Sequence, residues 1–529
     1  DMPPAKLKQA WSSIEAQAGK FKKRRAIRTE KTKAKDASYD IVFVTCDFEK
    51  SAIDVKVVYT SDAKVTGLFF VPAKPAFVGK EELWLGELDA GGAKLRLLLR
   101  IGKTADGKHQ ATLDSLDQGQ KGIPFDSVTY ENGKVRLEAK ALQVVYEGTI
   151  DESGKELSGE WRQGGASLPL TFKQVESEPQ ASRPQTPKRP FPYDEIEVAY
   201  ENKPAGVKLA GTLTVPRGEA LHPAAILITG SGAQDRDETI FNHKPFLVLA
   251  DYLTRRGIAV LRADDRGIGG STTSAEAATT ADLAEDVRSA IDFLKSRSEI
   301  DGTKIGLIGH SEGGTIAPLV ASQSSDVAFI VMLAGSVVTG EEVLYQQAAA
   351  LLKAGGASEK VLAAQRELQS RIFAIVKATP DAEQAVEKIN SGVAEFIDSL
   401  DEETRAGLGE VKAAAAAQAP RVAGKWFRFM LTYDPRPSLE KTHCPVLALN
   451  GANDLQVLPE ENLSIIREAL TAGGNADFET HELANLNHLF QTSRTGQVAE
   501  YAQIEETIAP AALELIANWI LRHVDTGRN

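Results

Sequence analysis

The pentapeptide G-H-S-E-G at residues 309–313 constrains this chain more than any other stretch. Residues 304–308 are a short apolar run that predicts a buried strand, and residues 313–321 continue in a helical pattern. Glycines two positions before and after the serine are typical of a sharp strand-to-helix turn, because its backbone passes close to its neighbours and leaves no space for a Cβ. The pattern predicts an exposed Ser311 hydroxyl, with the amide of Glu312 placed to donate to an oxyanion.

A serine hydroxyl is inert near neutral pH unless a base takes its proton and a third group orients that base. Four histidines follow the serine. His443 lies just before a predicted strand, His481 falls inside one, and His523 lies in the last turn of the terminal helix. Only His488 occupies a loop directly after a strand and before the closing helix, so we expect it to be the base.

The acid is expected to come between the serine and the histidine in the chain. Asp454 follows the apolar run 446–450 through a glycine turn, which places it at the edge of the sheet where the serine lies. Glu460 and Glu461 are the alternatives, but they lie near the start of a helix, where acidic residues are ordinary. We therefore expect Asp454 to orient His488.

A tetrahedral oxyanion needs a second amide donor, which should come from the loop at residues 230–238. We expect this donor to be the amide of Ser231, with that of Gly232 as the alternative. The charged residues 235–237 are predicted to brace the loop by ion pairing. Residues 264–271 do not form a G-x-G-x-x-G dinucleotide loop, and they are predicted to be another structured loop at the same edge.

From residue 195 onward, strand and helix patterns alternate, which indicates a mostly parallel sheet covered on both faces. Its ligand crevice should lie beyond the carboxyl ends of the strands. We expect strands at 196–200, 208–215, 224–229, 258–263, 304–308, 327–334, 446–450 and 477–483, and helices at 245–255, 282–297 and 511–523.

The alternation stops at residues 340–432, which are helical throughout and are predicted to form a cap over the crevice. An aromatic cluster closes this segment, and it suits an acyl pocket and the cap's own core equally well. Its members are Trp426, Phe427, Phe429 and Tyr433.

The first part of the chain has a different organisation. Residues 1–75 combine a helical pattern at 4–18 with alternating strands, which predicts a small α+β domain. Residues 76–176 contain short, regularly spaced strands typical of a barrel or sandwich. The proline-rich residues 177–194 are predicted to be a linker to the catalytic domain at 195–529.

With 529 residues the chain is too long for one core. Its net charge of −12 argues against a general nucleic-acid binder. Residues 20–35 carry nine Lys and Arg against a single Glu30, which predicts a charged edge strand, with a polyanion or membrane-surface contact as the alternative. No apolar run is long enough for a membrane helix.

Neither the cysteines nor the histidines show metal-ligand spacing, so we expect no metal and no cofactor. The two cysteines, Cys46 and Cys444, fall in different predicted domains and make no disulfide framework, which leaves the compartment open. An oligomer is possible.

These motifs resemble those of α/β-hydrolases, in the bacterial esterase group related to dienelactone hydrolases and prolyl-oligopeptidase-type peptidases. The His-Gly-Gly-Gly loop of hormone-sensitive-lipase-like esterases is absent. The pieces before residue 177 resemble a cystatin-like α+β unit and a lipocalin-like β-barrel. The matching stretches are G-S-G at 230–232, D-R-D at 235–237, D-R-G-x-G-x-S at 265–271, the turn at 309–314, N-G-x-x-D-L-Q-V at 450–457 and N-H-L-F-Q at 487–491.

The resemblance implies a serine carboxylesterase that cleaves a small ester through an acyl-enzyme. It also implies a periplasmic or secreted location; otherwise the protein is cytoplasmic. Residues 1–4 carry no charged-then-apolar leader, so any signal peptide is expected to have been removed or omitted. The alternatives are an exopeptidase or amidase that uses the same residues, and a ligand-binding protein with a vestigial hydrolase domain.

Overall fold

The computed structural model describes Trp11, Ile14 and residues 19–524 except 35–36, 50–51, 60–64, 73–80, 90–93, 105–106, 117–119, 164–165, 179–181, 273–277 and 409–410. The chain divides into two compact units, Asp1–Gln180 and Ala181–Asn529. The helix predicted at 4–18 lies outside the described residues except for Trp11 and Ile14, which are helical. Among the described helices, none is both long enough and apolar enough to cross a membrane.

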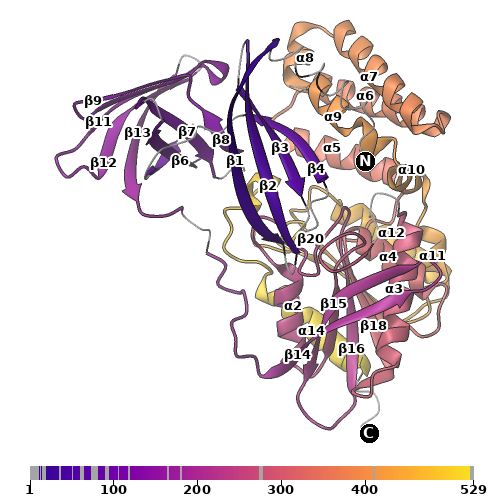
Figure 1. Ribbon diagram of the computed structural model, residues 1–529. Coiled ribbons are helices and arrows are strands. Elements are labelled where there is room, and N and C mark those ends of the chain that lie inside the picture. Colours follow the sequence, from indigo (N-terminus) through magenta and orange to yellow (C-terminus); the bar gives the residue numbers. More distant parts are fainter. Residues whose placement is uncertain are drawn as a thin grey trace. The chain divides into compact units, whose positions relative to one another are not determined.

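The second unit is built on an eight-stranded sheet of order β14-β15-β17-β16-β18-β19-β20-β21 (Figure 1). β14 and β15 pair antiparallel, β15 also pairs antiparallel with β17, and the remaining neighbours are parallel. The predicted mostly parallel sheet is confirmed. Its strands are β14 Tyr193–Asn202, β15 Val207–Pro216, β16 His222–Ile228, β17 Ala259–Ala263, β18 Ile300–His310, β19 Phe329–Leu333, β20 Val446–Gly451 and β21 Phe478–Leu483.

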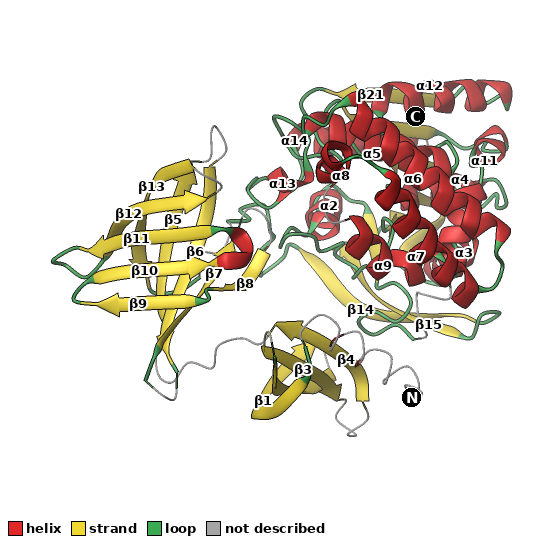
Figure 2. Ribbon diagram, turned by 90° about the horizontal axis from the view of Figure 1, so that it is seen from above, coloured by secondary structure: helices red, strands yellow, loops and turns green. Residues whose placement is uncertain are grey.

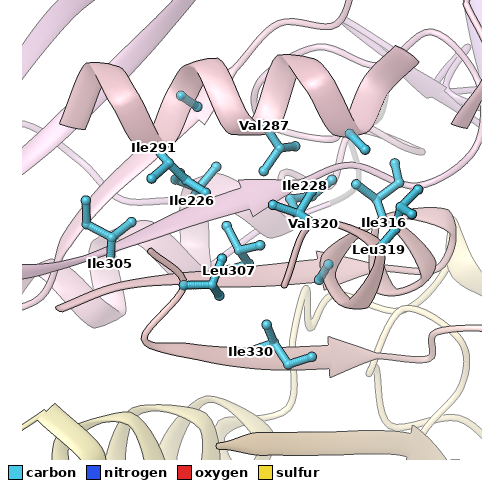
Figure 3. Close-up of a cluster of buried hydrophobic side chains, with 14 of the residues drawn as sticks. Ile226, Ile228, Val287, Ile291, Ile305, Leu307, Ile316, Leu319, Val320 and Ile330 are labelled. Atoms are coloured by element: carbon cyan, nitrogen blue, oxygen red, sulfur yellow. The ribbon is translucent and has the colours of Figure 1, made fainter. Parts of the chain in front are cut away.

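Helices cover both faces of this sheet. On one face α3, α4 and α12 pack on a core that includes Leu307, and on the other α2 and α14 pack on a core that includes Ile308. Successive residues of β18 thus point to opposite layers, as the strand period requires. Figure 3 shows Val287 and Ile291 directed from α3 toward the strands. The helices are α2 Pro245–Thr254, α3 Thr280–Lys295, α4 Glu312–Ala321, α12 Pro459–Ala472 and α14 Pro510–Val524.

The cap predicted at residues 340–432 is helical, as expected (Figure 1). It has its own apolar core, in which Phe373, Ile389, Phe396 and Phe427 are buried. A cap with its own core can sit over the sheet edge while the sheet below keeps its own packing. The cap helices are α5 Gly340–Ala354, α6 Glu359–Ala378, α7 Ala382–Ser399, α8 Glu402–Leu408, α9 Val411–Val422 and α10 Lys425–Thr432, and α11 Arg436–Glu440 leads back to β20.

The first unit contains a four-stranded antiparallel sheet of order β1-β2-β3-β4. The lysine- and arginine-rich stretch forms β1, an edge strand, which confirms the predicted charged edge. Charged side chains on an edge strand discourage pairing with other chains. The strands are β1 Phe21–Ala34, β2 Ala37–Phe48, β3 Ala52–Tyr59 and β4 Val65–Pro72.

A nine-stranded antiparallel sheet follows in the same unit, and Figure 2 shows it curled into a half-barrel. Its concave side encloses one apolar core with Trp84 and Trp161. The outermost described strands are β8 and β9, so closure into a lipocalin-like barrel stays a prediction. The strands are β5 Glu82–Asp89, β6 Lys94–Lys103, β7 His109–Ser115, β8 Gln120–Pro124, β9 Ser127–Glu131, β10 Lys134–Ala139, β11 Val144–Ile150, β12 Glu156–Gln163 and β13 Ala166–Val175.

The last part of the predicted linker is attached to the second unit. Arg183 donates hydrogen bonds to the carbonyls of Phe241, Ala502 and Ile504 at 2.8, 3.0 and 2.9 Å. Gln185 Nε2 donates to the carbonyl of Ile508 at 2.7 Å. These bonds satisfy carbonyls in the loops that precede α2 and α14.

Leu307 tests how far the second unit depends on its sheet core. Its side chain is fully buried, so Leu307→Ala should lower the free energy of unfolding by about 2–5 kcal/mol, through lost transfer energy and a cavity. Urea unfolding followed by helical circular dichroism measures this, because α2–α14 all belong to this unit. Leu221→Ala, at a site 59% exposed, is the matched control and should change stability by less than about 0.5 kcal/mol. Equal losses in the two variants would contradict the assignment of Leu307 to the core.

Candidate active site

Ser311 lies at the turn between β18 and α4, with φ 53° and ψ −114°. A positive φ is costly for a residue with a side chain, so the surroundings must hold this conformation. Two glycines allow it. A Cβ on Gly309 would lie 2.0 Å from the carbonyl oxygen of Gly313, and a Cβ on Gly313 would lie 2.1 Å from that of Ile228. The predicted lack of space at both glycines is confirmed.

The two residues after β18 have different backbone partners. The amide of Ser311 donates to the carbonyl of Leu333 on β19 at 2.8 Å, which ties the turn to the neighbouring strand. Glu312 is the first residue of α4, where an amide has no carbonyl four residues earlier within the helix. That amide is therefore available to a ligand at the helix N-terminus.

His488 and Asp454 form a buried pair, as predicted. His488 Nδ1 lies 2.8 Å from Asp454 Oδ2, and both residues are at most 5% exposed. The other oxygen of Asp454 accepts the amides of Gln456 and Val457 at 2.8 and 2.9 Å. The carboxylate is thereby fixed in orientation, and it holds a proton on Nδ1 so that Nε2 is the basic nitrogen.

The rejected alternatives have ordinary structural roles. His481 lies within β21 beside Glu479, and His523 accepts or donates hydrogen bonds at the end of α14 with Trp519 and Asp477. Glu460 and Glu461 are in the first turn of α12, as predicted. None of these residues lines the pocket that contains Ser311.

The loop at residues 230–238 starts beside the serine. A Cβ on Gly230 would lie 3.3 Å from the Cβ of Ser311, and Ser231 lines the same pocket. The charged residues after it brace the loop, as predicted. Arg236 pairs with Asp264 at 2.8 Å, and Asp237 pairs with Lys244 at 3.0 Å and with Arg262.

A cavity of about 370 Å³ lies between the sheet edge and the cap. Ser311, His488, Ser231 and Glu312 all line it. Much of its wall is apolar and comes from cap helices α5, α9 and α10. In the described part of the chain, no group of three or more His, Cys, Asp or Glu residues is arranged to hold a metal ion.

The aromatic cluster divides between the two roles that the sequence left open. Trp426, Phe427 and Tyr433 line the cavity, and Phe427 is also part of the cap core. Phe429 is not among the described lining residues, and its ring stacks on Tyr433 with centroids 5.2 Å apart.

Several known proteins are similar to this chain. Among solved structures, the α/β hydrolase GrgF from Penicillium sp. sh18 is 16% identical with a TM-score of 0.39, over 63% of this chain and 100% of that chain. Est1E from Butyrivibrio proteoclasticus is 14% identical with a TM-score of 0.36, over 62% of this chain and 99% of that chain. A family described as a protein of unknown function, DUF3887, matches residues 1–68.

The family described as serine aminopeptidase, S33, matches residues 244–492. Esterase EstD of Thermotoga maritima is 24% identical over 325 residues, which are 61% of this chain and 68% of that protein. The chain contains an α/β-hydrolase domain and is homologous to this esterase. This α/β-hydrolase also matches an uncharacterized 31.7 kDa protein from the traX-finO intergenic region of Escherichia coli, at 26% identity over 51% of this chain and 86% of that protein.

The carboxylate of Glu312 is an unexpected part of this hydrolase site. Its Oε1 accepts hydrogen bonds from Thr280 Oγ1 at 2.7 Å and from Trp426 Nε1 at 2.8 Å. Burial raises the pKa of Glu312, while these two bonds and the charge of Arg421 lower it. Glu312 thus connects the turn at Ser311 to α3 and to the cap helix α10.

His310, the residue before Ser311, joins the two loops that flank Ser311. Its Nδ1 lies 2.9 Å from Glu238 Oε1, and its Nε2 lies 3.0 Å from the carbonyl oxygen of His488. An ionised Glu238 carboxylate and the backbone carbonyl of His488 can only accept hydrogen bonds, so both ring nitrogens of His310 must carry protons. Burial lowers the pKa of His310, but the charge and hydrogen bond of Glu238 outweigh it, and the net pKa is raised.

Glu238 also accepts the amide of Gly230 through the same Oε1, at 2.7 Å. A second acid, the half-buried Asp265, also supports this loop. Asp265 accepts Thr229 Oγ1 and the amide of Gln234, both at 2.8 Å. Burial raises the pKa of Asp265 to about 7, although those hydrogen bonds lower it.

Sequence reasoning did not find the His310–Glu238 pair or the role of the Glu312 side chain. Glu238 is 72 residues from His310 and lies in a loop at φ 51°, so no spacing reveals the contact. The signals available in the sequence were His310 and Glu312, which lie within the G-H-S-E-G pentapeptide, and Glu238, which ends the loop at residues 230–238.

Glu238→Gln tests the His310 pair, because glutamine keeps the acceptor oxygen and removes the charge. A raised folded-state pKa of His310 contributes stability below the ordinary value of 6.5, and this contribution is lost as the pH rises through the folded pKa. The variant should therefore be less stable than wild type near pH 6, and the difference should shrink toward pH 9. Urea unfolding across this range measures it. The exposed Glu219→Gln control should differ from wild type by the same amount at every pH; a similarly constant difference for Glu238→Gln would contradict the ion pair.

Asp265→Asn gives a second pH test with the opposite trend. A carboxyl whose folded pKa is raised from 3.8 to about 7 destabilises the fold increasingly as the pH rises through that window. The asparagine variant should therefore gain stability relative to wild type between pH 5 and pH 8, by about 1 kcal/mol or more. Urea unfolding at the two pH values checks this, and a gain at pH 5 that disappears at pH 8 would contradict it.

Proposed function

We propose that the protein is a serine carboxylesterase that hydrolyses short-chain carboxylic esters through an acyl-enzyme. One observation carries the proposal: His488, whose Nδ1 lies 2.8 Å from Asp454, lines the same cavity as Ser311, which lies in a strained turn. The family supports the reaction class, since EstD of Thermotoga maritima is an esterase by name.

In the first half of the reaction, Ser311 Oγ attacks the ester carbonyl and its proton passes to His488 Nε2. Asp454 stabilises the resulting imidazolium through Nδ1. The carbonyl oxygen becomes an oxyanion, which accepts from the amides of Glu312 and Ser231. Collapse of this intermediate expels the alcohol, to which His488 returns the proton.

The second half repeats these steps with water as the nucleophile. His488 takes a proton from water as it attacks the acyl carbonyl, and the same amides hold the second oxyanion. Expulsion of Ser311 Oγ, which takes the proton back, releases the carboxylic acid. The apolar wall of the cavity suits the hydrocarbon part of the acyl group.

Ser311→Ala removes the nucleophile and should lower the turnover of a short-chain aryl ester by about a thousandfold or more. The fold should remain, because the glycines on both sides of position 311 are retained. Stopped-time assays with 4-nitrophenyl esters measure the effect, and circular dichroism checks the fold. Ser322→Ala, at the far end of α4, is the matched control and should keep wild-type turnover. Near-wild-type activity in Ser311→Ala would contradict the proposal.

Peptide or amide hydrolysis is the second candidate, because the matching family is described as serine aminopeptidase. An aminopeptidase needs acidic groups that hold the substrate amine. In the described lining of the cavity the acidic residue is Glu312, whose carboxylate already accepts from Thr280 and Trp426. We therefore place ester cleavage first. The rates on an aryl ester and on an aminoacyl anilide decide between the two, and faster anilide cleavage would favour the peptidase.

A further inference from the structure

Arg421 brings a positive charge to the wall of the cavity. It lies at the end of α9, and among the described residues that line the cavity it is the only Lys or Arg. Its guanidinium carbon lies 5.2 Å from the ring centroid of Trp426, which lines the same cavity. A guanidinium stacked on an indole keeps its orientation while its N–H groups remain available to an acceptor.

No carboxylate in the described part of the chain lies within ion-pair distance of this guanidinium. Other arginines of the unit, such as Arg236 and Arg266, are paired with Asp264 and Asp286. Arg421 thus differs from them in having its charge open to the cavity and solvent. An unpaired arginine beside an apolar pocket suits a planar anion that can accept two parallel hydrogen bonds.

Glu312 is the acidic residue in the described lining of the cavity, and its negative charge lowers the attraction of the cavity for an anion. Its carboxylate, however, is held by Thr280 and by the Nε1 of Trp426. Burial also disfavours the ionised form. The group that the cavity presents to a ligand is therefore the exposed guanidinium rather than the half-buried carboxylate, whose Oε1 already accepts two hydrogen bonds.

The position of Arg421 relative to the nucleophile follows from a short chain of contacts. Ser311 is next to Glu312 in the chain, and the carboxylate of Glu312 accepts a hydrogen bond from Trp426. The guanidinium of Arg421 lies over the ring of Trp426. The cavity wall around this path is apolar, with Val422 and Phe427. A hydrocarbon chain can cross this wall between the scissile carbonyl and the guanidinium.

We propose that Arg421 is a specificity-determining residue that binds a carboxylate at the far end of the substrate's acyl chain. The preferred substrates are then half-esters of dicarboxylic acids, with methylene groups that occupy the apolar wall between the two ends. This inference rests on the proposed esterase function. Arg421 contributes binding of the distal carboxylate and takes no part in the transfer of protons or of the acyl group.

Three aryl esters of equal chain length test the proposal with the full-length protein. One is a monoaryl ester of adipic, pimelic or suberic acid, the second is the neutral alkanoate, and the third carries a terminal trimethylammonium group. Adipic and longer acids are chosen because their esters cyclise slowly without enzyme. We expect wild-type kcat/KM to be highest for the carboxylate, lower for the neutral ester and lowest for the cation. The reverse order would assign recognition to Glu312 and overturn the proposal.

Arg421→Gln should lower the carboxylate-to-neutral ratio of kcat/KM by about tenfold or more, mainly through KM. Arg421→Lys should retain part of the preference, because it keeps the charge but loses the planar fork. Lys425→Gln is the matched control, since it removes an exposed charge near Trp426 from a residue outside the described lining. Its ratio should equal that of wild type.

The outcomes separate the two proposals. If wild type cleaves the neutral ester but Arg421→Gln leaves the ratio unchanged, the role of Arg421 is overturned and the esterase proposal stands. An equal fall of this ratio in Arg421→Gln and Lys425→Gln would also overturn the role of Arg421. The preference would then come from the positive charges of the cap as a group rather than from one guanidinium. If wild type cleaves none of the three esters, the esterase function itself fails.

Discussion

The close approach of the backbone around Ser311 is the constraint on which the site depends. β18 and α4 meet so tightly that neither Gly309 nor Gly313 has space for a Cβ, and the serine between them takes a positive φ. Such a turn persists only where its surroundings fix it. Here the amide of Ser311 bonds to β19, and the core layers on both faces of the sheet hold β18 in register. The strain is thus stabilised by the packing of the whole sheet, and it points the serine out of the sheet edge.

A network of buried polar groups then brings three separate loops to that serine. His310 connects Glu238 of the loop at residues 230–238 to the carbonyl of His488, and Glu312 connects the turn to the cap through Trp426. These links have different physical characters. The first is an ion pair shielded from water, whereas the second is a pair of hydrogen bonds to a carboxylate whose burial raises its pKa. The His310–Glu238 ion pair therefore fixes the loops around Ser311, and the hydrogen bond between Glu312 and Trp426 fixes the cap to the turn.

The sequence predicted those parts whose information is local. The alternation of strands and helices from residue 195, the helical segment 340–432 and the loop positions of His488 and Asp454 follow from periodicity and glycine placement, and the structure has each of them there. Contacts between side chains that are far apart in the chain could not be predicted from the sequence. Glu238 reaches His310 from a loop position where its own φ is 51°. Arg421 lines the cavity because α9 packs over the same edge of the sheet. The aromatic cluster shows the same limit, since Trp426 and Phe429 are close in sequence but differ in whether they line the cavity.

The central claim is that the strained turn makes Ser311 a nucleophile. Treatment of the intact protein with a fluorophosphonate, followed by peptide mapping of the adduct by mass spectrometry, tests it most directly. The account predicts about one phosphonyl group per chain, on the peptide that contains Ser311, and its loss when His488 is replaced by alanine. An adduct on another serine, or labelling that survives the loss of His488 at an unchanged rate, would contradict it.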